Sequence, residues 1–112
     1  MLEWLPKIDQ YLSDFDNLID NIFLLGGSFN HQTDVGIEYF LTKLWEINKP
    51  YKKKIWIFAR EELKDVKPIF KEYCQFIKTG AYIPELKCED NIQYSIKLAT
   101  KNQNVYEQGL DF

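Results

Sequence analysis

The chain has 112 residues, of which 46% are hydrophobic and 16% aromatic, which is enough to predict one folded domain with a core. Cys74 and Cys88 are too few and too far apart for a disulfide framework or a zinc site. No apolar run is long enough to cross a membrane and no secretory signal is visible, so we expect a cytoplasmic protein without membrane contact.

The formal net charge of −3 is unevenly distributed. Residues 1–42 contain seven acidic residues and one lysine, a net charge of −6, whereas residues 43–112 have a net charge of +3. The stretch at residues 51–58, YKKKIWIF, is only a short basic cluster, of a kind that is usually solvated. Because no nucleic-acid-binding signature accompanies it, we expect no direct contact with nucleic acid.

The first predicted helix starts near residue 5 or 6, with Pro6 in its first turn. Apolar residues recur there at helical spacings of three and four: Leu5, Ile8, Leu12, Phe15 and Ile19. The apolar run NIFLL at residues 21–25 then predicts a buried strand, which ends at Gly26 and Gly27.

Thr33 can cap a second helix over residues 34–48. KIWIFA at residues 54–59 predicts the second strand, and CQFIKTG at residues 74–80 predicts the third. Pro68 divides the polar stretch between these strands into a short helix and a turn-like piece.

Alternating helices and strands predict an α/β fold with a small, three- to four-stranded, mainly parallel sheet flanked by helices. We expect a single domain, with an α/β core at residues 1–86 and a C-terminal segment at residues 87–112. That segment has no sustained period, and we expect it to wrap the sheet as a loop with one short strand near Val105.

Ligands of parallel α/β folds bind at the carboxyl ends of the strands, here residues 26–30, 59–61 and 79–82. The glycines at 26 and 27 would let the backbone approach a carboxylate or phosphate, but a tight strand exit explains them more simply. His31, the only histidine, has no neighbouring ligand and fits a surface loop. Without a catalytic constellation, we favour a non-catalytic role.

Four separated stretches resemble the C-terminal part of anaerobic ribonucleotide reductase activating proteins of the radical S-adenosylmethionine superfamily. They are IFLLGGSFN, KKIWIFARE, YCQFIKTGAYIPEL and TKNQNVY, and the third is the most specific. The resemblance covers residues 8–106 and implies a truncated, partial radical-SAM-like barrel. By the same resemblance, Gly26, Gly27 and Asn30 match residues that contact S-adenosylmethionine.

The chain departs from this family in its chemistry. It lacks the C-x-x-x-C-x-x-C loop that holds the [4Fe-4S] cluster, Ser28 replaces an acid, and Asn104 replaces an arginine. We therefore expect no cofactor, with weak residual binding of S-adenosylmethionine as the alternative. The family's first strand also lacks a counterpart, so an unpaired sheet edge should be covered by the N-terminal helix, the C-terminal segment, a second copy or a partner protein.

The expected function is protein–protein interaction by a cluster-less activase-like domain, as a small phage or mobile-element inhibitor of a host enzyme or defence nuclease, for example an anti-CRISPR-type protein. The alternative is an auxiliary or split component of reductase activation with a residual S-adenosylmethionine-type site. A small-molecule or nucleotide binder is a third reading. The candidate interaction residues are Asp9, Asp14, Asp16, Asp20, Phe29, His31, Tyr82 and Glu85.

Overall fold

Helix α1 (Trp4–Phe15) opens the chain in a computed structural model that describes residues 1–112. It is followed by the short 3-10 helix η1 (Asp16–Leu18). Only Leu12 of α1 is fully buried, and the Trp4 indole packs edge-on against Phe40, with ring centroids 5.8 Å apart. The predicted helix is therefore present, and Leu5, Ile8 and Leu12 of the predicted stripe face the core. Phe15 is 46% exposed and Ile19 lies beyond the helix, so the stripe is shorter than predicted.

Strand β1 (Asn21–Leu25) leads into η2 (Gly26–Phe29), a 3-10 turn, and then into helix α2 (Asp34–Asn48). The predicted cap of α2 is confirmed, since the Thr33 hydroxyl accepts a hydrogen bond of 3.0 Å from the backbone N–H of Gly36. The apolar side of α2 supplies most of the buried helical residues of the core.

Strand β2 (Lys54–Phe58) and strand β3 (Phe76–Thr79) are joined by η3 (Leu63–Asp65) and helix α3 (Pro68–Tyr73). Pro68 lies in the first turn of α3, where its missing N–H does not break a helical hydrogen bond. Pro68 does divide this stretch, but the turn-like piece, η3, precedes it and the helix, α3, begins at it.

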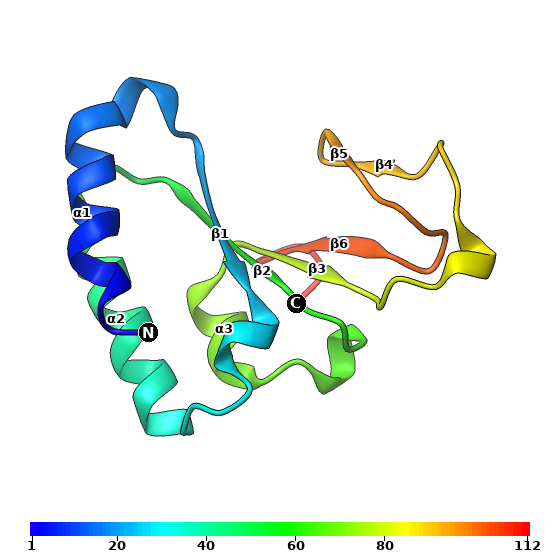
Figure 1. The fold of residues 1–112 in the computed structure, drawn as a ribbon, viewed down its shortest axis with the longest axis horizontal. Coiled ribbons are helices and arrows are strands. Elements are labelled where there is room, and N and C mark those ends of the chain that lie inside the picture. The colour runs from blue at the N-terminus through cyan, green and yellow to red at the C-terminus, as the bar shows by residue number, and fades with distance from the viewer.

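The main sheet has the strand order β1-β2-β3-β6, where β6 spans Asn104–Glu107. Strand β2 pairs in parallel with β1 and β3, whereas β6 pairs antiparallel with β3. The three helices cover one face of this sheet, and the core lies between them (Figure 1). It is built from Ile55, Ile57 and Ile77 of the sheet and from Phe40, Leu41 and Leu44 of α2.

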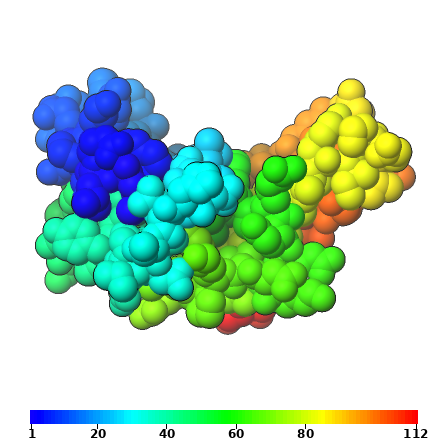
Figure 2. Space-filling view, turned by 60° about the horizontal axis from the view of Figure 1, so that its bottom comes forward, coloured from blue at the N-terminus to red at the C-terminus, as the bar shows by residue number.

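Residues 84–103, which we call the wing, connect β3 to β6 and project at the end of the molecule away from α1 (Figures 1 and 2). The wing contains η4 (Pro84–Leu86) and the hairpin of β4 (Ile92–Gln93) and β5 (Ile96–Lys97). Tyr94 and Ser95 form the hairpin turn with φ angles of 51° and 65°.

The fold is an α/β fold with a mixed four-stranded sheet, and the prediction of a mainly parallel sheet is wrong. Two strand pairings of the chain are parallel, and two, β3–β6 and β4–β5, are antiparallel. The reason is that no crossover helix follows β3: the wing reverses the chain, and β6 runs back beside β3. The predicted strand near Val105 is confirmed as β6.

None of the helices is both long and apolar enough to cross a membrane.

Candidate functional site

The carboxyl ends of β1, β2 and β3 lie side by side at one end of the sheet, as predicted. The register pairs Leu25 with Phe58 and Phe58 with Lys78, so the three strands end side by side. The backbone continues this alignment beyond the strands, because the Ala59 N–H donates to the Lys78 carbonyl at 2.8 Å. Any ligand at these carboxyl ends would contact the segments that follow all three strands.

The two glycines of η2 differ in whether a larger residue would fit at their positions. A Cβ at Gly26 would lie 2.7 Å from the carbonyl oxygen of Phe58, so only glycine lets β1 end this close to β2. A Cβ at Gly27 would meet nothing closer than the Asn30 side-chain nitrogen at 4.0 Å. Packing alone therefore accounts for Gly26, whereas the backbone at Gly27 is exposed and has room beside it.

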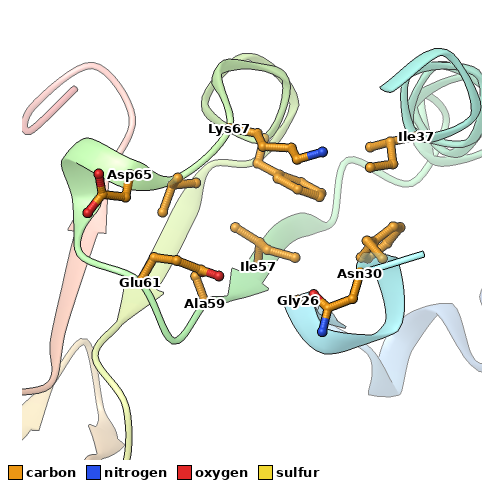
Figure 3. Close-up of a pocket in the computed structure, with 11 residues that line it drawn as sticks. Gly26, Asn30, Ile37, Ile57, Ala59, Glu61, Asp65 and Lys67 are labelled. Carbon is orange, nitrogen blue, oxygen red and sulfur yellow. The ribbon is translucent and has the colours of Figure 1, made fainter. Parts of the chain in front are cut away.

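A cavity of about 170 Å³ lies beside η2, and Gly26, Asn30, Glu61 and Lys67 are among its lining residues (Figure 3). The Lys67 ammonium is bound to the Asp34 carboxylate at 2.6 Å, which reduces the charge that it offers to a ligand. Binding sites for drug-sized molecules are roughly 300–1,000 Å³. This cavity suits a few waters or a small ion better than a nucleoside.

The end of β3 is shaped by the stretch at residues 100–104, so two of the motifs quoted above lie in contact. Gly80 has a φ of 95°, and a Cβ there would lie 3.0 Å from the Asn102 carbonyl oxygen. The Gln103 amide donates to the Gly80 carbonyl at 3.2 Å, and the Asn102 amide donates to the Ala81 carbonyl at 2.9 Å. These amide side chains fix the wing against the end of β3.

The face of the sheet away from the helices carries aromatic side chains, and we call its uncovered part the open face: Phe23, Leu25, Phe58 and Lys78. The Phe23 ring lies 5.2 Å from Phe58 and 5.3 Å from Trp56, measured between centroids. The Lys78 ammonium lies 6.0 Å from the Phe58 centroid, and burial lowers the pKa of this amine.

Strand β1 forms one edge of the sheet, and no strand pairs with its outer side. Phe23 is 43% exposed and Leu25 is 60% exposed. Helix α1 packs on α2, and the C-terminal strand β6 lies at the opposite edge of the sheet. Neither of the two chain segments expected to cover the edge pairs with it.

The candidate interaction residues lie in separate places. Asp9, Asp14, Asp16 and Asp20 are exposed on α1, η1 and the following loop, whereas Tyr82 is exposed just before the wing and Glu85 is exposed within it.

Two further candidates lie at and just after η2. Phe29 is buried and packs against Phe40 and Phe70, with centroids 5.8 and 5.3 Å away, so its side chain is part of the core. His31 is exposed in the loop before α2.

Sequence reasoning missed the open face and a lysine-lined groove at the amino ends of the strands. Alternating aromatic residues in β2, Trp56 and Phe58, were a signal for the open face, since alternate residues of a strand share one face. Trp56 lies on the same side of the sheet but is buried, and its indole N–H donates a hydrogen bond to Oδ1 of Asn21 at 2.9 Å. Trp45 is 42% exposed and belongs to the groove.

No family model, no curated protein and no solved structure matches this chain.

Proposed function

We propose that this chain acts without chemistry of its own, by binding another protein that adds a strand along β1. The observation that carries the proposal is the free outer side of β1 together with the exposed side chains of Phe23 and Leu25. An unpaired strand edge offers a row of backbone donors and acceptors, and apolar side chains beside it add affinity.

Strand β1 lacks the features by which edge strands usually avoid pairing. Its sequence, NIFLL, contains no charged residue and no proline, and its register with β2 is continuous from Asn21 to Leu25 without a bulge. Proteins normally protect such edges with lysine, proline or a bulge. An unprotected apolar edge favours a strand from a partner as its occupant.

The resemblance described above suggests which partner this is: a cluster-bearing component of anaerobic ribonucleotide reductase activation. In this proposal the chain is the partial radical-SAM-like barrel, and the partner's strands extend its sheet. The open face would then line the inside of the completed barrel. The convergence of the strand ends supports the proposal, as does the contact of residues 100–104 with the end of β3. A residual S-adenosylmethionine site would then need groups from both proteins.

A charge placed on the edge tests this proposal. We would mix the chain with an activase truncated to its cluster-bearing part, and measure co-elution by size-exclusion chromatography with light scattering and glycyl-radical formation by electron paramagnetic resonance. The wild type should restore both, and Leu25→Lys should restore neither. Val35→Lys is the matched control, because Val35 is 79% exposed on α2, away from the edge.

Restoration by Leu25→Lys equal to that by the wild type would contradict strand addition at β1. A stable homodimer that Leu25→Lys dissociates would instead identify a second copy of the chain as the occupant of the edge.

A second candidate function, inhibition of a nucleic-acid enzyme, is favoured by the charge of the N-terminal end. Asp9, Asp14 and Asp20 are exposed and form no ion pair with a lysine or arginine. An acidic surface of this kind can occupy a basic nucleic-acid channel. A defence nuclease that cleaves DNA equally fast with and without excess chain, at low salt, would remove this candidate.

A further inference from the structure

A groove lies at the amino ends of the strands, where α2 ends and β2 begins. It is separate from the site at the carboxyl ends of the strands. Its volume is about 670 Å³. Lysines dominate its charge, with Glu46 as its one lining carboxylate; the lysines are Lys49, Lys52, Lys53 and Lys54. The groove is thus locally cationic in a chain whose net charge is negative.

Three of the four lysines form no ion pair within the chain, and of these Lys54 has an aromatic neighbour, since its ammonium lies 5.5 Å from the Phe76 ring centroid. Lys53 forms an ion pair with Asp16 at 2.5 Å and is largely buried. Lys49 and Lys52 are exposed and form no ion pair. Lys52 also adopts a φ of 56°, a conformation that glycine or asparagine usually takes, so a lysine side chain is present where the backbone favours a smaller residue.

One wall of the groove is a fixed aromatic surface. The Trp45 indole N–H donates to the Tyr73 carbonyl at 2.7 Å, and the two rings meet edge to face with centroids 5.6 Å apart. Trp45 is nevertheless 42% exposed. Because its polar atom is already satisfied, the exposed indole surface is free to contact an apolar side chain.

We propose that this groove binds an acidic protein segment in which an aromatic or aliphatic side chain is flanked by carboxylates. The apolar side chain would lie on Trp45, and the carboxylates would bind the ammonium groups of Lys49 and Lys52. The cationic lysines and the exposed indole of Trp45 together favour this one occupant. The inference does not depend on strand addition at β1.

A short acidic segment fits the surroundings better than nucleic acid does. Asp16 borders the groove through its ion pair with Lys53. Asp20 is next to Lys54 along the backbone, since the Lys54 backbone N–H donates to the Asp20 backbone carbonyl at 3.2 Å. A long polyphosphate that extends beyond the lysines would approach these acidic residues and be repelled, whereas a short peptide need not extend that far.

The test uses fluorescence anisotropy with the full chain and a fluorescein-labelled peptide, Glu-Glu-Leu-Phe-Glu-Glu, beside its neutral analogue, Gln-Gln-Leu-Phe-Gln-Gln. The double variant Lys49→Glu/Lys52→Glu should bind the acidic peptide about tenfold more weakly than the wild type, because attraction becomes repulsion at both sites.

The control variant Lys87→Glu/Lys101→Glu changes the net charge equally at exposed positions outside the groove, and it should bind like the wild type. Glu46→Gln should bind about twofold more tightly, since a like charge is removed. Circular dichroism of each variant separates loss of binding from loss of folding.

Four outcomes would overturn the proposal. The groove variant could bind the acidic peptide as tightly as the control variant does, or the wild type could prefer the neutral peptide. A short single-stranded DNA could bind more tightly than the acidic peptide and lose affinity in the groove variant, which would assign the groove to nucleic acid. Self-association abolished by Lys49→Glu/Lys52→Glu would assign it to a second copy of the chain.

Discussion

The two faces of the four-stranded sheet are built from the same strands but differ in how they are closed. On the helix-covered face, Ile55, Ile57 and Ile77 are almost inaccessible to solvent. On the other face, Trp56 and Phe76 are buried under Leu98 of the wing, whereas Phe23 and Leu25 near the β1 edge are exposed. One face is a completed core, and the other is completed only where the wing reaches.

This difference separates residues needed for folding from residues available for binding. Side chains packed between the sheet and the helices stabilise the domain, since each has lost nearly all its contact with water. Side chains at the β1 edge have gained much less from folding, and a partner would bury them further. Mutations on the two faces should therefore differ in their effects on stability.

The largest expected effect comes from Ile57→Ala on the helix-covered face. Ile57 is 1% exposed, and truncation should lower the free energy of unfolding by about 3 kcal/mol through lost burial and a cavity. Phe23→Ala removes a larger side chain but should lower it by only about 1 kcal/mol, because the ring is already partly in water. Urea denaturation measures both. Equal losses would mean that the open face is as closed in solution as the core.

The glycine turn gives the next largest effect. Gly26→Ala should lower the free energy of unfolding by about 2 kcal/mol, since the new Cβ would meet the Phe58 carbonyl oxygen at 2.7 Å and the strands must separate. Gly27→Ala should change it by less than about 0.5 kcal/mol, because no atom lies within contact distance apart from the Asn30 side chain. A neutral Gly26→Ala would contradict the packing explanation of this glycine.

The sequence predicts the helix-covered half of the molecule well for a physical reason. Helical stripes and unbroken apolar runs report burial on that face, and Thr33 and Pro68 mark where α2 and α3 begin. The same patterns predict a short strand near Val105 but do not show that it pairs antiparallel with β3, where Thr79 lies opposite Asn104, 25 residues further along the chain. Such long-range pairing depends on where the wing turns.

The wing was missed because its turn lacks the usual sequence signal. Two-residue hairpin turns of this kind normally use Asn-Gly or Asp-Gly, yet Tyr94 and Ser95 adopt positive φ angles here. Amide side chains hold the segment instead, and their partners are backbone atoms that no sequence motif identifies. Of the candidate site, the carboxyl ends of the strands are predicted from the sequence pattern and an unpaired sheet edge from the resemblance, whereas the exposed aromatic face beside β1 and the lysine-lined groove are not predicted.

Gln103 should stabilise the wing but not the helix-covered core. Removing its side chain therefore tests whether the sheet face covered by the wing opens independently of the core. Its buried side chain accepts hydrogen bonds from the backbone N–H groups of Ala99 and Thr100 and donates to Gly80. Gln103→Ala leaves these groups unsatisfied and should destabilise the wing by about 1.5 kcal/mol. Hydrogen exchange should accelerate about tenfold at Leu98 and stay unchanged at Ile57; equal acceleration at both would show that the wing unfolds only with the core.

The smallest expected effect compares the two cysteines, one in each region. Cys74 is fully buried in the core, and burial raises the pKa of its thiol from 9.0 to about 12, whereas Cys88 lies in the wing and is partly accessible. The folded state keeps the Cys74 proton at a pH where the unfolded state loses it, so stability falls as pH rises above 9 and continues to fall towards 12.

Between pH 9 and 10 this thiol should lower the free energy of unfolding by about 1 kcal/mol, measured as the difference between the wild type and Cys74→Ala over that range. Other groups titrate in both proteins and cancel in the difference. A thiol reagent at neutral pH gives the matching kinetic test: Cys88 should react about a hundredfold faster than Cys74, because the buried thiol reacts only when the core opens. Similar rates at the two cysteines would mean that the helix-covered face opens as readily as the wing, and the contrast between the two regions would not hold in solution.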